Sequence, residues 1–358
     1  HGVEFVFTLV GGLTGAATGF GMQVTYLPSV ACEEGGMCDG TALVIASPVI
    51  SAVTLIEEPE TERIVSWPSS SGGIEIWMME SLSWTDGARC GDAMVSGNFS
   101  LTPESDPLAG MAVGCADGES PSVYVVQQPM FVPSSENRFT SGSRISEGIS
   151  ESSEGFGQTL AVGDFNDDGL DDVVVGAPQS SRNCTVGNCG SVHVFQGPHL
   201  DEITIEDALV NITGDSRNDG LGHGLAVGDM DGDGTEDLLV GTDLGWFGTE
   251  PKKGAVLMYA GTAISAGGEM TEAEAFHIVR GTEFNSDFGA TIAVVPDMDG
   301  DLSPELLVGA PKSRLMGTQA GAVYGLFGPW TAAPESSTLT ARVLHGKDVR
   351  EFLGTSIT

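Results

Sequence analysis

Residues 156–178 read FGQTLAVGDFNDDGLDDVVVGAP: a short apolar segment, a loop rich in acidic residues, and a second apolar segment that ends in Gly-Ala-Pro. The pattern returns at residues 221–243 as LGHGLAVGDMDGDGTEDLLVGTD and at residues 288–311 as FGATIAVVPDMDGDLSPELLVGAP. A stretch that recurs at a nearly constant distance along the chain is the signature of a fold built from similar units. The repeat therefore decides the architecture, and the remaining segments are interpreted relative to it.

The repeating unit is longer than the acidic loop alone. The first loop aspartates, Asp164, Asp229 and Asp297, are 65 and 68 residues apart. Each unit continues with a third apolar segment: GSVHVFQG from Gly190, GAVLMYAG from Gly254 and GAVYGLFG from Gly321. A fourth segment closes each unit: ALVNITG at 208–214, AFHIVRG at 275–281 and ARVLHG at 341–346. Each unit is thus predicted to contain four strands.

The fold class predicted from this repeat is all-β. Val173-Val174-Val175 is continuously apolar, as in strands buried on both faces, whereas residues 191–195 alternate more. Four strands per unit, repeated about every 65 residues, are typical of a β-propeller, in which small antiparallel sheets surround a channel. Helical solenoids would instead show an apolar period of about 3.6 residues, which these units lack. We expect four-stranded antiparallel blades, six or seven in number.

The first 150 residues carry the same frame in a degenerate form. Gly19-Phe20-Gly21 resembles the start of a unit, with residues 43–48 in the place of the second strand and residues 73–77 as the next strand. Cys90-Gly91-Asp92 starts another unit, and the Ser/Glu-rich segment 133–154 is interpreted as a long surface loop. One propeller domain is expected over 1–358: a partial blade at 1–19, degenerate blades at 20–89 and 90–155, clear blades at 156–220, 221–287 and 288–351, and the start of a further or shared blade at 352–358.

Oxygen-bearing side chains alternate through the acidic loops, at positions 1, 3, 5 and 9 counted from the first aspartate. Calcium is a hard cation that takes roughly six to eight oxygen ligands, and such a loop offers carboxylates together with a backbone carbonyl at position 7. The expected ligands are Asp164, Asn166, Asp168, the Leu170 carbonyl and Asp172 in the first loop, and Asp229, Asp231, Asp233, the Thr235 carbonyl and Asp237 in the second loop. The spacing differs from that of an EF-hand, because the loop leads into a strand and no glutamate stands at position 12.

The third loop keeps the spacing but departs at two positions. Leu302 replaces the glycine at position 6, where a positive φ strains a residue that has a Cβ, and Glu305 replaces the last aspartate. The expected ligands are Asp297, Asp299, Asp301, the Ser303 carbonyl and Glu305. We therefore expect two calcium sites and a weaker third one. The alternative is a set of Asp/Gly-rich hairpin turns without a metal, although turn chemistry alone does not require so many carboxylates in one loop.

Six cysteines occur as close neighbours in the sequence. An even number in a strongly acidic chain favours local disulfides and an oxidising compartment, with scattered buried thiols as the alternative. The candidates are Cys32 and Cys38, Cys90 and Cys115, and Cys184 and Cys189. We hypothesise that a disulfide within residues 32–38 holds the turn that calcium would hold in the clear repeats. Three N-x-[ST] sequences would allow N-glycosylation in a eukaryotic secretory route, at Asn98, Asn183 and Asn211.

The composition excludes several classes of function. Only 14 Lys and Arg residues stand against 50 Asp and Glu residues, and the formal net charge of -36 repels nucleic-acid phosphates and anionic lipid. No apolar run reaches the roughly 18–20 residues of a membrane helix, so no membrane insertion of this chain is expected. The chain contains no G-x-S-x-G, H-E-x-x-H or G-x-x-x-x-G-K-[ST] motif, and its six histidines do not cluster in the sequence. We therefore expect that it is not an enzyme.

The unit FG…GDxNxDGxxDxxVGAP…GxVxVF resembles the FG-GAP repeat of integrin α-subunit propellers and of many microbial and algal surface proteins. The resemblance covers residues 150–358 and, in outline, residues 19–126. It implies a β-propeller with calcium in loops on one face and with ligands or partner subunits at the opposite face or the rim. The calcium-binding residues of the family correspond to positions 1, 3, 5 and 9 of the three loops. The chain shows no sign of the inserted adhesion domain of vertebrate integrins, so an integrin pairing partner is not implied.

The function expected is that of an extracellular or cell-surface propeller that binds structural calcium and mediates adhesion or protein–protein assembly without catalysis. Its partner would be an extracellular protein or a glycan. Self-assembly is a further option, because an unfinished blade can accept a strand from a neighbouring subunit. Two alternatives are a structural subunit of an extracellular filament or appendage, and a carbohydrate-binding or accessory domain of a secreted enzyme. Trp330, in a predicted loop, would either contact such a partner or pack against the edge of a blade.

Overall fold

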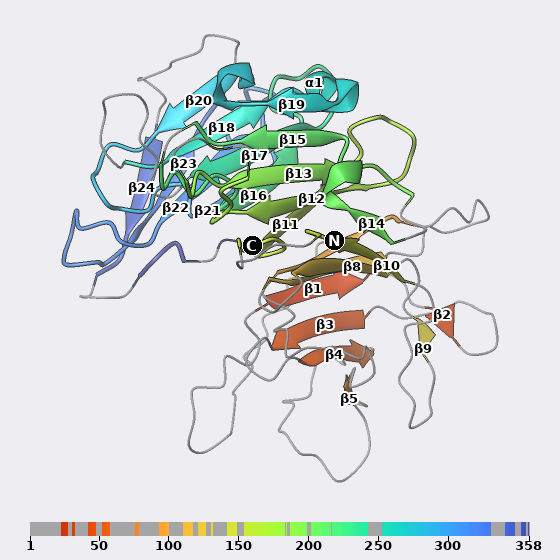
Figure 1. Cartoon of the computed structure of the whole chain (residues 1–358). Helices are drawn as coiled ribbons and strands as arrows, with labels where there is room; N and C mark the ends of the chain where they lie inside the picture. The colour runs from red at the N-terminus through yellow and green to blue at the C-terminus, as the bar shows by residue number, and fades with distance from the viewer. Residues whose placement is uncertain are drawn as a thin grey trace, which may run out of the picture.

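The structure is a computed structural model of the whole chain (Figure 1). It describes residues 23–27, 31–32, 42–47, 52–57, 76–78, 93–99, 110–116, 121–126, 130–131, 142–148, 154–182, 184, 187–198, 202–215, 217–242, 253–330, 341–347, 352–355 and 357.

The described residues form five antiparallel sheets that follow one another along the chain. The first sheet contains β1 (Gln23–Leu27), β3 (Ala42–Ser47), β4 (Ala52–Glu57) and β5 (Ile76–Met78). The second contains β6 (Met94–Gly97), β7 (Gly110–Cys115), β8 (Ser122–Val126) and β10 (Gly142–Ser146). A separate parallel pair joins β2 (Ala31–Cys32) to β9 (Met130–Phe131).

The last three sheets contain the clear repeats. The third sheet has β11 (Thr159–Gly163), β12 (Asp172–Ala177), β13 (Ser191–Phe195) and β15 (Val210–Thr213). The fourth has β16 (Gly224–Gly228), β17 (Asp237–Thr242), β18 (Ala255–Tyr259) and β20 (His277–Arg280). The fifth has β21 (Thr291–Val295), β22 (Glu305–Ala310), β23 (Ala322–Leu326) and β24 (Ala341–His345). The prediction of an all-β chain made of four-stranded antiparallel units is confirmed.

Two predictions for the N-terminal half were wrong in detail. The third strand of the first sheet is β4, and residues 76–78 form the fourth strand, β5, rather than the third. Segment 133–154 is not only a loop, because it contains β10, which pairs with β8. β10 was missed because its sequence, GSRIS, is polar, and its pairing with β8 places Ile145 in the core.

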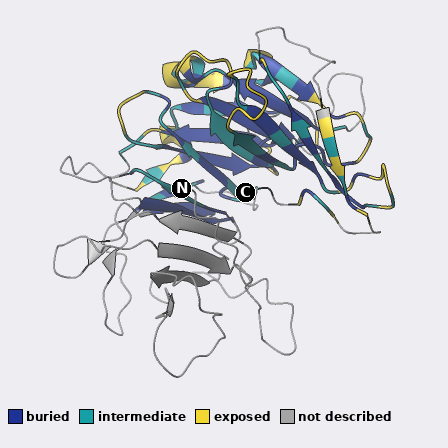
Figure 2. Cartoon of the chain, turned by 180° about the vertical axis from the view of Figure 1, so that it is seen from behind, coloured by how far each residue is buried: buried dark blue, intermediate teal, exposed yellow. Residues whose placement is uncertain are grey.

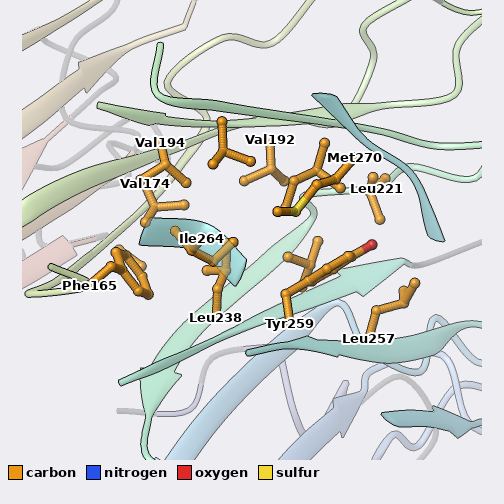
Figure 3. Close-up of a cluster of buried hydrophobic side chains, with 14 residues drawn as sticks. Phe165, Val174, Val192, Val194, Leu221, Leu238, Leu257, Tyr259, Ile264 and Met270 are labelled. Carbon is orange, nitrogen blue, oxygen red and sulfur yellow. The ribbon is translucent and has the colours of Figure 1, made fainter. Parts of the chain in front are cut away.

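The first strands of successive sheets lie next to one another. β1 contacts β6, β6 contacts β11, β11 contacts β16, and β16 contacts β21. The sheets therefore follow one another in a stack along the chain. In the sheets that Figure 2 colours by burial, buried strands lie between more exposed loops. Apolar side chains from two adjacent sheets form the cores, as in the cluster between the third and fourth sheets, which contains Val174 and Val194 together with Leu238 and Leu257 (Figure 3).

Short parallel strands extend two of the sheets with residues of the following unit. β14 (Ile203–Thr204) pairs with β10, and β19 (Gly268–Met270) pairs with β15. These additions provide backbone partners for strands that would otherwise be sheet edges. The period-2 pattern of the sequence predicted four strands per unit but could not show that the next unit adds a fifth.

The start of each following unit also attaches to the sheet before it. Leu221 forms a parallel bridge with Gly190, and Leu353 forms the equivalent bridge with Gly321. The Thr291 hydroxyl donates to the Gly354 carbonyl over 2.8 Å, as Thr159 does to the carbonyl of residue 222. Residues 352–354 therefore make the contacts that the start of a unit makes elsewhere in the chain.

Helical structure is minor in the described part of the chain. It comprises α1 (Gly261–Ala266) and two 3₁₀ turns, η2 (Ile205–Asp207) and η3 (Glu272–Glu274). All three lie in connections between the third and fourth strands of a unit, where no helix was predicted. None of the helices in the described residues has the length and apolar character needed to cross a bilayer.

Candidate metal centres

The three acidic loops occupy equivalent places in the last three sheets, between the first and second strands. Cross-strand pairing places Gly163 opposite Asp172, Gly228 opposite Asp237, and Val295 opposite Glu305. The second strand of each hairpin therefore begins at position 9, which is an acidic residue in all three loops. The side chain at that position is anchored at the strand end, and positions 1 to 8 form the loop that projects from the sheet.

The residue at position 9 accepts hydrogen bonds from the backbone at the base of the loop. Asp237 Oδ2 accepts from the Met230 amide over 2.9 Å and from the Asp231 amide over 3.2 Å, and its Oδ1 accepts from Gly261 over 2.9 Å. Asp172 bonds the Phe165 and Gly197 amides in the same way. These carboxylates are buried, so each one ties its loop to the strand and to the end of the third strand.

The side chains at positions 1, 3 and 5 also bond to loop amides, and the bonds repeat from loop to loop. The first-position carboxylate accepts from the amide at position 6: Gly169 donates to Asp164, Gly234 to Asp229, and Leu302 to Asp297. The side chain at position 3 accepts from the amide at position 5: Asp168 donates to Asn166, Asp233 to Asp231, and Asp301 to Asp299. The carboxylate at position 5 accepts from the amide at position 7: Leu170 donates to Asp168, Thr235 to Asp233, and Ser303 to Asp301.

This shared pattern gives a finding about the third loop, for which the sequence predicted strain at Leu302. Leu302 has a φ of 74°, so it does adopt the left-handed conformation that glycine adopts at position 6 of the other loops. Its side chain is 92% exposed and contributes little to packing. At positions 1, 3 and 5 the third loop nevertheless makes the same side-chain hydrogen bonds as the others, so this part of the loop keeps its conformation with a leucine at position 6.

Two loops bring three carboxylates together closely enough to hold a metal ion. Asp229, Asp231 and Asp237 have ligand oxygens within 4.8 Å of one another, and so do Asp297, Asp299 and Glu305. Among the described residues the first loop gives no such cluster of three acids. Its third position is the amide of Asn166, whose Nδ2 donates to Asp168 over 2.9 Å. The fifth-position aspartates, which are also expected ligands, are not members of either cluster.

Burial affects the ionisation of the position 9 carboxyls. Loss of solvent raises the pKa of Asp172 to about 7 and that of Asp237 to about 6, and the neighbouring loop carboxylates contribute to both shifts. At exposed positions the shift is in the opposite direction, because hydrogen bonds from Thr235 lower the pKa of Asp233. A cation in the loop would favour the ionised form of the buried carboxyls and would offset the repulsion among them.

The donor sets fit a hard divalent cation. Both clusters consist of oxygen atoms only, as Ca²⁺ and Mg²⁺ prefer. In the third loop, Glu305 is 1% exposed; its Oε2 accepts from the Met298 amide over 2.8 Å, whereas its Oε1 is buried without a hydrogen-bond partner. A buried carboxylate oxygen without a partner is costly, and a bound cation would satisfy it. The two clusters could therefore hold metal ions.

Other predicted site residues have varied outcomes. Cys184 and Cys189 form a disulfide, as predicted. Cys115 is also disulfide-bonded, whereas Cys38, Cys90 and Asn183, together with the side chain of Cys32, lie outside the described residues. The proposed disulfide within residues 32–38 therefore stays a prediction. Trp330 is only 2% exposed and its Nε1 donates to the Pro304 carbonyl over 2.7 Å, so it packs within the fold and does not present a contact surface.

Two of the predicted glycosylation sites are engaged in hydrogen bonds inside the protein. Asn211 lies in β15, where its Oδ1 bonds His193 over 2.6 Å and its Nδ2 donates to Glu269 over 3.0 Å. The Asn98 Nδ2 donates to the Gly169 carbonyl over 2.7 Å. A glycan on either nitrogen would have to replace these bonds. Glycosylation at the three positions stays a prediction.

Sequence reasoning missed two groups of buried acids. Glu272 and Asp219 are buried and lie together, and burial with the charge of Asp219 raises the pKa of Glu272 to about 8. Glu147 is buried near Glu154, and its pKa is raised to about 7 mainly by burial. Asp219 and Glu272 are far apart in the sequence, so no motif of closely spaced residues could have shown that they lie together.

Comparisons with known proteins agree with the repeat. The family model described as "FG-GAP repeat" matches residues 156–195. Integrin alpha-5 of Xenopus laevis is 31% identical over 169 residues, which cover 47% of this chain and 15% of that protein. Integrin alpha-V of Gallus gallus is 30% identical over 195 residues, 53% of this chain and 17% of that protein.

A relative of a different kind also matches. Phosphatidylinositol-glycan-specific phospholipase D of Mus musculus is 31% identical over 215 residues, which cover 56% of this chain and 24% of that protein. The aligned regions thus span less than a quarter of the length of these curated relatives. A crystal structure of BBS1N in complex with ARL6DN aligns over 84% of the chain at 12% identity, with a TM-score of 0.38 that is too low to inform the fold. The chain thus contains a match to the FG-GAP repeat at residues 156–195 and is similar in sequence to integrin α-subunits.

Proposed function

We propose that the chain is a calcium-stabilised β-propeller that acts outside the cell in adhesion or protein–protein assembly and has no catalytic activity of its own. The observation that carries the proposal is that one loop conformation recurs in three successive sheets. In two of these loops, three carboxylates lie close together. Contacts between the first strands of successive sheets support a radial arrangement of blades. The domain boundaries 20–89, 90–155, 156–220, 221–287 and 288–351 would then be those of the blades.

The chemistry of the loops supports calcium in a structural role. Asp229, Asp231 and Asp237 would hold one ion, Asp297, Asp299 and Glu305 a second, and Asp164, Asn166 and Asp172 the ion of the first loop. The ion would supply positive charge among carboxylates that otherwise repel one another. The carboxylates themselves orient the loop, because each one also accepts a backbone amide, and they bind the cation only in that conformation.

The extracellular location rests on two observations. Cys184 and Cys189 form a disulfide, and disulfides persist mainly in oxidising compartments. Two of the relatives are integrin α-subunits by name. Both agree with a secreted or surface protein whose partner is an extracellular protein or a glycan.

A second candidate function is an accessory domain of a secreted enzyme. A relative named as a phospholipase D matches more than half of this chain but only about a quarter of its own length. Repeats of this kind can therefore occur beside a catalytic part. In that case the propeller would bind or position a substrate for a separate domain.

The experiment that tests the proposal has two parts. Thermal unfolding of the purified chain with Ca²⁺, with Mg²⁺ and with a chelator should show a stabilisation specific to Ca²⁺. The chain would then be immobilised and tested against a glycan array and a panel of extracellular matrix proteins. Calcium-dependent binding to one class supports the adhesion function. An unfolding curve that is unchanged by calcium contradicts the structural role of the ion.

A further inference from the structure

A carboxylate of one acidic loop contacts the backbone of the loop in the preceding sheet. Glu236 stands at position 8 of the second loop, and its Oε2 accepts a hydrogen bond from the amide of Asp164 over 2.9 Å. Asp164 is position 1 of the first loop, 72 residues earlier in the chain. The two loops are therefore joined by a bond between a side chain and the residue that begins the other loop.

The same relationship occurs one sheet earlier. Asp171, at position 8 of the first loop, accepts from the amide of Asn98 over 2.6 Å, and its own amide donates to the Asn98 carbonyl over 2.8 Å. Asn98 follows β6 as Asp164 follows β11. A carboxylate at position 8 thus reaches back to the residue after the first strand of the preceding sheet in both cases.

Glycines make room for these contacts. A Cβ on Gly163 would lie 2.8 Å from Glu236 Oε2, and a Cβ on Gly97 would lie 2.8 Å from Asp171 Oδ2. Any larger residue before position 1 would push the carboxylate away from the amide that it bonds. The glycine and the acid of the next unit therefore form a matched pair.

The third loop lacks this connection. Its position 8 is Pro304, which has no carboxylate, and the Pro304 carbonyl accepts from Trp330 of the same unit. A Cβ on Gly228, the glycine before the second loop, would instead meet Val294 at 2.8 Å. Within the described residues, the hydrogen bonds from position 8 connect the second loop to the first but not the third loop to the second.

From this arrangement we propose that Glu236 is a positioning residue that couples calcium binding in the second loop to calcium binding in the first. The inference rests on the proposed function, because it requires that both loops bind Ca²⁺. Glu236 lies between Thr235 and Asp237, whose carbonyl and carboxylate are expected ligands. An ion in the second loop fixes this segment, holds Glu236 Oε2 in place, and thereby orders the backbone of Asp164 before the first loop is filled.

The coupling must act in both directions. If an ion in the second loop raises the affinity of the first, an ion in the first loop raises the affinity of the second by the same factor. A single hydrogen bond to a charged acceptor is the link, so we expect a factor of about five to ten. The third loop should bind independently of the second.

The test uses the full chain and isothermal titration with Ca²⁺ as the ligand. Chains with one active loop are made by alanine substitutions at positions 1 and 3 of the other loops, where position 3 is Asn166 in the first loop and an aspartate in the other two. Chains with two active loops are made in the same way. With the first and second loops active, binding should be about five- to tenfold tighter than the two single-loop titrations predict. With the second and third loops active, the titration should equal the sum of the single-loop titrations.

Variants at position 8 identify the residue responsible. Glu236→Ala should abolish the coupling, and Glu236→Gln, which keeps an acceptor oxygen, should retain most of it. Asp171→Ala is the matched control, because it removes the equivalent contact to Asn98 but leaves the link between the two loops. Circular dichroism in a chelator checks that each variant is folded. If Glu236→Ala does not fold, the comparison of the two loop pairs still decides the question.

The outcomes separate the two proposals. Single-loop chains that bind no Ca²⁺ would overturn the proposed function and the coupling together. Calcium binding in each single-loop chain with strictly additive behaviour of the first and second loops would overturn only the coupling. Equal coupling in both loop pairs, or coupling that survives in Glu236→Ala, would also show that Glu236 is not the link.

Discussion

The amide of Leu302 donates to Asp297 Oδ2 over 3.0 Å, which is the bond that Gly234 makes to Asp229 over 3.1 Å in the preceding loop. The leucine keeps this bond at a φ of 74°, in the left-handed region that disfavours residues with a Cβ. Leu302 therefore adopts the same left-handed conformation as the glycines at this position, although a residue with a Cβ disfavours it. The hydrogen bonds to the carboxylates, rather than the glycine, define the loop.

Leu302→Gly should stabilise the calcium-free chain. Removing the strain of the left-handed conformation should raise the free energy of unfolding by about 1–2 kcal/mol. The greater conformational freedom of glycine in the unfolded chain should lower it by about 0.5–1 kcal/mol. A net gain of roughly 0.5–1 kcal/mol is expected from urea unfolding in a chelator. Gly234→Ala is the control, because a Cβ there has no atom within 4 Å and the cost would come only from its φ of 92°. A loss of stability in Leu302→Gly would show that the leucine side chain has a packing role.

Positions 3 and 9 of the second loop should respond differently to substitution by alanine. Asp231 accepts one amide at an exposed position, so Asp231→Ala should change the calcium-free stability by less than about 1 kcal/mol and should abolish the calcium-induced increase in Tm that depends on this loop. Asp237 is buried and accepts three amides, so Asp237→Ala should cost at least about 2 kcal/mol even without calcium. Unfolding with and without a chelator measures both effects. Equal calcium-free losses in the two variants would contradict the anchoring role of position 9.

His193 should make the fold less stable in acid. It is buried, its Nε2 lies 2.8 Å from the Ser191 hydroxyl, and burial lowers its pKa to about 4 from an ordinary value of 6.5. The unfolded chain therefore binds more protons than the folded chain between pH 6.5 and pH 4, and stability falls as the pH decreases through this window. The contribution is about 3 kcal/mol at most.

The measurement is the free energy of unfolding against pH for the protein and for His193→Gln. Glutamine has no proton to gain, so the difference between the two curves isolates the histidine from the carboxyl groups that titrate in the same range. A difference that grows by about 1 kcal/mol per pH unit below pH 6.5 is expected. A difference that is constant with pH would show that His193 is not held neutral in the fold.

Glu272 should have the opposite pH dependence. Burial and the charge of Asp219 raise its pKa to about 8, so the folded chain binds more protons than the unfolded chain between pH 4.5 and pH 8. Stability is lost as the pH rises through this window. Glu272→Gln, which is neutral at every pH, should therefore be more stable than the natural chain at pH 8 and similar to it at pH 4.

Glu274, two residues later, is the matched control for this prediction. It is exposed at the end of η3, and hydrogen bonds from Thr271 lower its pKa. Glu274→Gln should thus reduce stability at neutral pH and have little effect in strong acid. Thermal unfolding at pH 4 and pH 8 distinguishes the two residues. Equal behaviour of the two variants would contradict the assignment of Glu272 as a buried acid.

The sequence by itself determined the features that depend on a few neighbouring residues. Alternating or continuous apolar residues indicated the strands, and the spacing of oxygen-bearing side chains identified the three loops. The positive φ of Leu302 was predicted because Leu302 occupies the loop position at which the other two loops have glycine. The close spacing of Cys184 and Cys189 indicated their disulfide. These features depend on backbone geometry and turn chemistry, which act within a single hairpin.

The tertiary structure decided which atoms meet between units. It placed Trp330 in the core, added β14 and β19 to the preceding sheets, and gave the polar segment GSRIS a strand partner in β8. It also brought Glu236 to the amide of Asp164 across 72 residues, although an acid at position 8 is only one more carboxylate in an acidic loop. Such contacts depend on how adjacent sheets pack against each other, and no local pattern in the sequence shows which residues of two sheets will meet.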